Sequence, residues 1–174
     1  MSVHTLTVYL HVIGAFIMFG GLMIEIIGFD RLRKATTTSE VAGSLSFFRA
    51  LPTTYPIAAT TLLVTGLYLT ISEWGWHGWI VVSLVMLTAI APVGSTIGGK
   101  KYPAIGMETA RTPGGVSDDL RRLLDDRVLS VSLFTRSGVA LGIVYLMVAK
   151  PPLFTSLIAI AVMGLAGLLV ARSR

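Results

Sequence analysis

Long apolar stretches constrain this chain more than any other feature of its sequence. Five of them, at about 5–29, 54–72, 78–98, 128–149 and 151–171, have the ~20 apolar residues that a helix needs to cross a bilayer. A mean hydropathy of +0.78 and 13% charged residues agree with this assignment. The sequence therefore predicts an all-α, polytopic membrane bundle of four core transmembrane helices plus a fifth C-terminal one. We expect one integral membrane domain over 1–174.

Most basic residues lie at one of the two ends of the expected bundle. Twelve of the 14 lie in 30–51, in 99–127 or after 171, whereas the opposite loops hold only Lys150. By the positive-inside rule, the amino terminus lies outside and the carboxyl terminus lies in the cytoplasm. The fourth helix then has a cytoplasmic extension and covers 117–149. No single basic stripe interleaved with aromatic residues is present, so we expect a lipid bilayer as partner and no nucleic acid.

Two rows of residues at seven-residue spacing run side by side along the first helix. The polar row is His4, His11, Met18 and Glu25, and the row of small residues is Thr7, Gly14, Gly21 and Gly28. Seven residues are nearly two helical turns, so each row lies close to one face. Small residues let a neighbouring backbone approach closely. This face is therefore expected to pack against protein, and the polar row to point into the bundle.

Glu25 and Arg136 are the charged residues placed deep in the expected bundle. Both lie near the cytoplasmic ends of their helices, at roughly equal depth. An unpaired charge there costs about 2.5–3.5 kcal/mol or more, so we predict an intramembrane ion pair between them. The alternatives are that Arg136 extends to the headgroups, that the pair serves a proton or anion path, or that Arg136 holds an acidic cofactor group.

His11 carries the most specific hypothesis about a cofactor. It lies about 9 Å below the outer surface, either as a neutral side chain hydrogen-bonded to another helix or as an axial ligand of haem b. His4 cannot be the opposite ligand of the same iron, because the two lie ~10.5 Å apart along one helix face. Met86 on the third helix has a suitable depth, and His/Met ligation is typical of electron-transfer haem.

His4 and His77 both fall at the outer surface. Each is explained by solvation alone, and together, with Glu73 as the acid on that side, they form a weak candidate metal site. The chain has no cysteine, which excludes disulfides and thiolate metal sites. Nor does it contain a hydrolase, phosphate-loop or dinucleotide-binding motif.

Short apolar motifs resemble those of a known family. The opening LHVIGAFIMFGG, the LLVTGLYL of the second helix and the closing LMVAKP resemble the predicted bacterial integral membrane proteins of domain-of-unknown-function family 2269, over roughly 5–151. More distantly, a His-bearing first helix followed by Gly-Gly resembles the copper-resistance D proteins and the haem-dependent membrane protoporphyrinogen oxidases. These resemblances imply a bacterial plasma membrane protein, and the oxidase resemblance implies a haem ligand at His11.

Three functions remain open from the sequence. The first is haem b binding through His11 for electron transfer or haem-linked chemistry. The second is a cofactor-free structural or partner-binding subunit, as a homo-oligomer or with another membrane protein. The third is a small transporter of a solute or metal.

The orientation is testable by thiol labelling, because the natural chain has no cysteine. We expect Ser2→Cys and Glu73→Cys to react with an impermeant maleimide in intact cells, and Ser173→Cys to react only after lysis. If only the Ser173 variant were labelled in intact cells, the protein would have the opposite orientation.

Overall fold

The computed structural model describes residues 2–111 and 114–173, and the regular structure there is helical apart from one bridge between Thr37 and Gly115. The long helices are α1 (Val3–Lys34), α3 (Leu51–Leu69), α4 (Gly78–Arg111), α6 (Arg127–Ala149) and α7 (Leu153–Arg172). The short elements are α2 (Thr38–Leu45), the single turns η1 (Ser46–Phe48) and η2 (Thr70–Trp74), and α5 (Asp118–Leu124).

The predicted fold class is confirmed. Five helical segments of the described chain are long and apolar enough to cross a membrane. Large apolar side chains cover the outside of the bundle; Phe16, Val148 and Phe154 are each more than 70% exposed. A surface of this kind is stable in hydrocarbon and unfavourable in water. The chain is therefore an all-helical membrane bundle.

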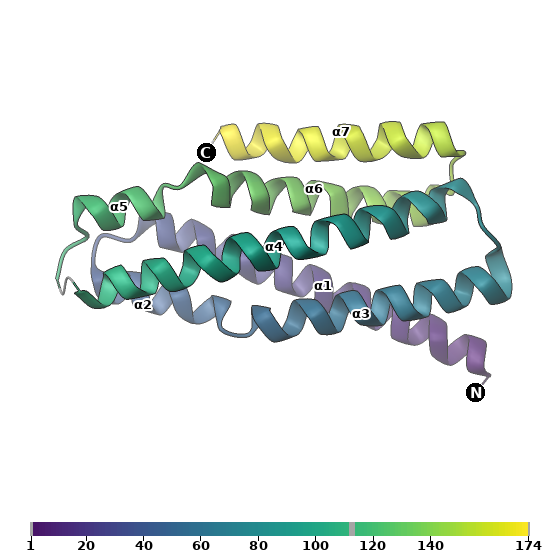
Figure 1. Ribbon diagram of the computed structural model, residues 1–174, viewed down its shortest axis with the longest axis horizontal. Coiled ribbons are helices and arrows are strands. Elements are labelled where there is room, and N and C mark those ends of the chain that lie inside the picture. Colours follow the sequence, from purple (N-terminus) through teal and green to yellow (C-terminus); the bar gives the residue numbers. More distant parts are fainter. Residues whose placement is uncertain (1, 112–113, 174) are drawn as a thin grey trace.

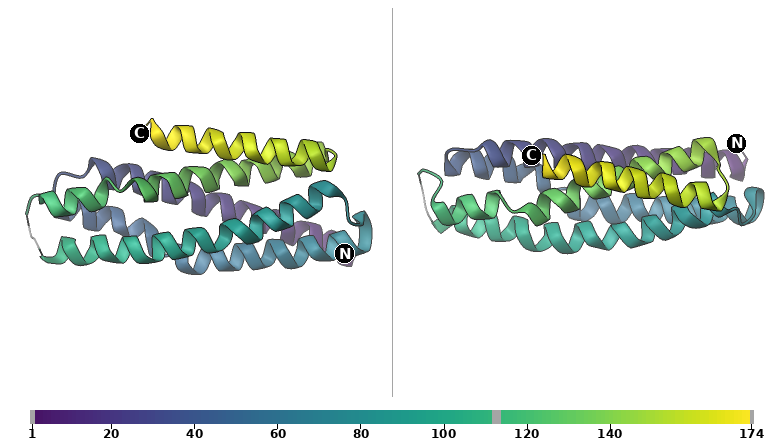
Figure 2. Two further views of the ribbon diagram at one scale, coloured as in Figure 1. Left: turned by 45° about the horizontal axis from the view of Figure 1, so that its top comes forward. Right: turned by 90° about the horizontal axis from the view of Figure 1, so that it is seen from above.

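The long helices run roughly along one axis, and α7 lies on the outside of the bundle against α6 (Figures 1 and 2). The amino terminus, the α3–α4 turn and the α6–α7 turn lie at one end (Figure 1). We call this the tryptophan end, after Trp74, Trp76 and Trp79. The opposite end holds α2 and α5, and we call it the basic end.

The largest departures from the helix boundaries expected from sequence occur in the third and fourth helices. The third was expected to end at residue 98, but α4 continues through Pro103 to Arg111. The fourth was expected to be continuous over 117–149, but it divides into α5 and α6. The division occurs because the Asp126 side chain accepts a hydrogen bond from the Val128 N–H at 2.7 Å and caps a new helix.

The basic end is closed by side chains that bind helix termini. Arg121 of α5 donates to the carbonyls of Arg33 and Ala35, at 2.9 and 2.6 Å, and so neutralises the carboxyl end of α1. Lys101 of α4 forms an ion pair with Asp126 at the start of α6. These contacts tie the connecting segments to the ends of the long helices.

Helices α6 and α7 pack backbone against backbone. Gly138 faces the Met163 carbonyl, and Gly167 faces the Phe134 carbonyl, so closely that a Cβ on either glycine would collide with the neighbouring helix. Helix backbones do not move aside as flexible side chains do. The two glycines therefore set the distance between α6 and α7.

Alanine substitution should separate these two helices. We expect Gly138→Ala or Gly167→Ala to lower the free energy of unfolding by about 1–3 kcal/mol, the usual cost of overpacking. Gly164→Ala is the control, since its Cβ would lie 3.4 Å from Val139 Cγ2, an ordinary contact. Thermal melting in detergent compares the three, and equal melting temperatures would contradict the packing argument.

Candidate functional site

The glycine row of α1 packs against protein, as its spacing predicts. A Cβ at Gly14 would lie 3.2 Å from Thr61 Cγ2, and one at Gly21 would lie 3.1 Å from Tyr55 Cε1, both on α3. At Gly28 the added atom would lie 2.9 Å from the Phe48 ring. The space beside these glycines is filled by α3 and η1. The polar row of α1 therefore lies beside a close helix contact.

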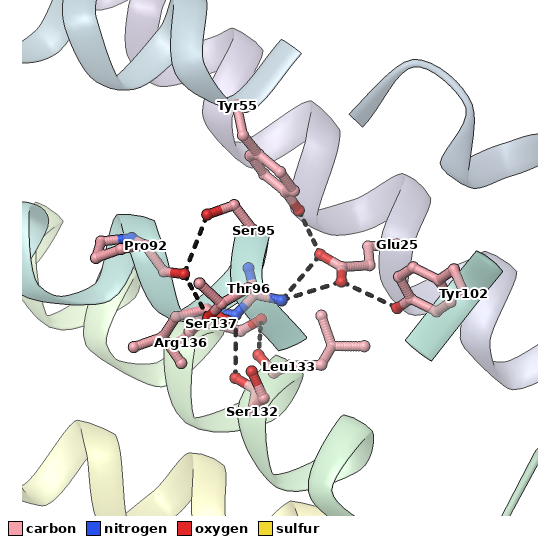
Figure 3. A network of polar contacts seen from close by, with 11 residues as sticks. Glu25, Tyr55, Pro92, Ser95, Thr96, Tyr102, Ser132, Leu133, Arg136 and Ser137 are labelled. Atoms are coloured by element: carbon pink, nitrogen blue, oxygen red, sulfur yellow. Dashed lines mark hydrogen bonds and ion pairs between the residues drawn. The ribbon is translucent and has the colours of Figure 1, made fainter. Parts of the chain in front are cut away.

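The structure brings Glu25 and Arg136 together in the bundle interior (Figure 3). Arg136 Nη2 lies 3.0 Å from Glu25 Oε1 and 3.1 Å from Oε2, and Arg136 Nε donates to the Ser132 carbonyl at 3.2 Å. The two side chains are 10% and 3% exposed, so water does not screen their attraction. The pair joins α1 directly to α6.

Two tyrosines complete the partners of the Glu25 carboxylate. Tyr55 of α3 donates to Oε2 at 2.6 Å, and Tyr102 of α4 donates to Oε1 at 3.0 Å. The Tyr102 ring stacks on Phe48 of η1, with ring centroids 4.0 Å apart. The carboxylate thus accepts hydrogen bonds from α3, α4 and α6 (Figure 3).

Neither tyrosine was among the site residues predicted from sequence. The available signal is that a tyrosine within a membrane bundle needs a partner for its hydroxyl, and few polar partners exist at that depth. Tyr55 and Tyr102 both lie toward the basic ends of their helices, as Glu25 does. That shared depth identifies them as candidates, although sequence alone does not give the rotation of α3 and α4.

His11 is held by Thr65 of α3. Its Nδ1 lies 2.8 Å from Thr65 Oγ1, and that hydroxyl donates its one hydrogen to the Thr61 carbonyl at 2.5 Å. Oγ1 must therefore accept from His11, which places the hydrogen on Nδ1. In a neutral imidazole, Nε2 then carries the lone pair, and no described residue hydrogen-bonds to it. This is the state in which a histidine binds a metal through Nε2.

A cavity of about 580 Å³ lies between α1, α3, α4 and α6. Most of its lining is apolar, with His11 in the wall of α1. Lys150 and Trp74 line its tryptophan end, and Arg136 lines it toward the basic end. Arg136 of α6 and Lys150, which directly follows this helix, are 14 residues apart, or about 21 Å along a helix. The cavity is therefore long and follows the bundle axis.

The structure does not bring the other predicted site residues to His11. Met86 packs beside Val82 of the second apolar cluster and is not among the residues that line the cavity. His4 Nδ1 lies 3.3 Å from Glu73 Oε1, with both side chains about half exposed. His77 is exposed, and its backbone carbonyl accepts the first hydrogen bonds of α4. Within residues 2–111 and 114–173, no group of three or more His, Cys, Asp or Glu is placed to hold a metal.

Comparison with known proteins identifies one family. A family described as a predicted integral membrane protein, DUF2269, matches residues 5–151. The chain belongs to this family. The match covers α1 to α6 and ends before α7, so the four helices around the cavity lie within it. No curated protein and no solved structure matches the chain. The more distant resemblance to copper-resistance D proteins and to protoporphyrinogen oxidases finds no support in these comparisons.

Removing one member of the Glu25–Arg136 pair should cost more than removing both. We expect Glu25→Gln or Arg136→Gln alone to destabilise the protein by about 3–5 kcal/mol, because each leaves a buried charge without its partner. The double variant should lose less than the sum of the single losses.

Thermal melting of all four proteins in detergent measures this coupling. The control is Lys34→Gln, which breaks an exposed ion pair with Asp30 and should cost less than about 1 kcal/mol. Strictly additive losses at Glu25 and Arg136 would show that the contact carries no coupling.

Proposed function

We propose that the protein binds haem b in the cavity, with His11 Nε2 as an axial ligand, and that it does so in a bacterial plasma membrane with its amino terminus outside. The observation that carries the proposal is the Thr65–His11 hydrogen bond of 2.8 Å. It fixes both the ring and the position of its hydrogen, and metal-binding histidines are usually held in this way.

The cavity fits such a group in size and character. Its volume of about 580 Å³ falls within the ~300–1,000 Å³ usual for cofactor sites. The apolar lining suits a porphyrin ring. At the tryptophan end, Lys150 lies over the Trp74 ring, with Nζ 3.7 Å from its centroid. Lys150 is the cation on that side that could face the carboxylates of the haem.

A second methionine is a candidate for the ligand opposite His11. Met147 of α6 lines the cavity, whereas Met86 does not. Met147 lies on α6 and His11 on α1, so the two would hold a bound group from different walls of the cavity. We therefore propose Met147 in place of Met86 as the candidate sixth ligand. Bound haem would supply one-electron chemistry, and the protein residues would set its orientation and exclude water.

An optical spectrum tests haem binding directly. Protein produced with ample haem should show a Soret band after purification in detergent, and His11→Ala should abolish it without loss of insertion. His4→Ala is the matched control, since that residue is half exposed near the chain start, and it should leave the band intact. Met147→Leu should shift the spectrum or potential, whereas Met86→Leu should not.

Two outcomes would contradict this proposal. If wild-type protein stays colourless at every step, the haem proposal is wrong and His11 is a packing residue of a cofactor-free subunit. A band that survives His11→Ala would place any haem elsewhere. Ligand-dependent flux in liposomes without a chromophore would instead support transport.

A further inference from the structure

The cavity end at Arg136 carries a hydrogen-bond donor that the haem proposal does not use. Nη2 and Nε of Arg136 are bonded to Glu25 and to the Ser132 carbonyl. Its other terminal nitrogen, Nη1, has no hydrogen-bond partner among the described residues. Arg136 is more than nine-tenths buried and lines the cavity. Nη1 is therefore a donor without a protein partner at the wall of a mostly apolar cavity.

The charge of this site is already balanced. Glu25 neutralises Arg136, and its oxygens also accept from Tyr55 and Tyr102. A bound anion would bring an uncompensated charge into a medium of low dielectric constant, which is costly. A neutral acceptor would satisfy Nη1 without that cost. The chemistry therefore favours a carbonyl oxygen over a carboxylate or phosphate.

Exposed residues of α3 and α4 line the cavity at this depth. They are Pro56 of α3 and Pro92 and Ser95 of α4. Ser95 follows Gly94, whose backbone lies against the Arg136 guanidinium. The space between α3 and α4 is therefore the route by which a molecule dissolved in the membrane would reach Nη1.

We propose that this end of the cavity binds the carbonyl oxygen of a neutral, lipid-soluble molecule, a quinone or a neutral glyceride, which arrives from the bilayer between α3 and α4. The carbonyl accepts a hydrogen bond from Arg136 Nη1, and the apolar chain extends through the opening into the lipid. The proposal does not depend on haem, since His11 lies 14 residues from Glu25 on α1, about 21 Å along the helix.

Calorimetric titration of delipidated protein in detergent tests the ligand class. The probes are decylubiquinone, dioctanoylglycerol and decanoate, which carry a quinone carbonyl, ester carbonyls and an anionic carboxylate. We expect saturable binding of at least one neutral probe, and which of the two binds more tightly separates quinone from glyceride. Decanoate should bind at least about tenfold more weakly, since hydrogen bonding does not repay its desolvation. Absence of binding by both neutral probes, or tighter binding of decanoate, would overturn the proposal.

Two variants locate the binding at Nη1. Gly94→Ala places a Cβ against Nη1 and 2.7 Å from Arg136 Cζ, and so displaces the guanidinium. Arg136→Lys keeps a positive charge for Glu25 and removes the second terminal nitrogen. Each should raise the Kd of the bound probe about tenfold or more, the usual effect of losing a hydrogen bond to a charged group. Gly99→Ala, on the same helix with nothing within 4 Å of its Cβ, should leave the Kd unchanged.

The result is separable from the haem experiment. His11→Ala should leave probe binding intact, and Arg136→Lys should leave any Soret band intact. If Gly94→Ala does not fold, Arg136→Lys alone decides. A Kd unchanged in every variant that folds would show that the probe binds elsewhere and would overturn the assignment to Arg136.

Discussion

The buried Glu25 carboxylate is the interaction on which the arrangement of the four core helices depends. Its two oxygens accept from Tyr55 of α3, Tyr102 of α4 and Arg136 of α6, while the residue itself belongs to α1. In a bilayer, apolar side chains pack about as well against lipid as against each other, so burial alone does not select one helix arrangement. A polar group with partners on three other helices does select one. We infer that this network fixes the rotation of each helix about its axis.

The same network organises the basic end. Phe48 stacks on Tyr102, and the small size of Gly28 admits the Phe48 ring beside α1. Arg121 then binds the carbonyls that end α1. The connecting segments thus reach the membrane-buried carboxylate through one aromatic contact.

Sequence patterns were sufficient for the fold class, because hydropathy over about 20 residues is a strong signal in a bilayer. They also indicated Glu25 and Arg136 as partners, since two lone opposite charges at equal depth leave few alternatives. They did not reveal Tyr55, Tyr102 or Met147. To find these residues, one must know which face of α3, α4 and α6 points into the bundle, and these helices lack a marked polar face that would indicate it. The sequence predicted the hydrogen bond of His11 only as one to another helix, and the structure identifies its partner as Thr65 of α3. The break at Asp126 was not predicted, because the charged residues around it are compatible with one continuous helix. Only the structure shows that Asp126 caps a new helix there.

The proposed opening between α3 and α4 would determine which concentration of a ligand controls its binding in the cavity. A molecule that partitions into lipid is confined to a thin layer, so its density around the opening far exceeds its average in the cell. Occupancy then follows the mole fraction of the molecule in the membrane rather than its aqueous concentration. A site that forms a single hydrogen bond can be largely filled under those conditions, and it would respond to the composition of the bilayer itself.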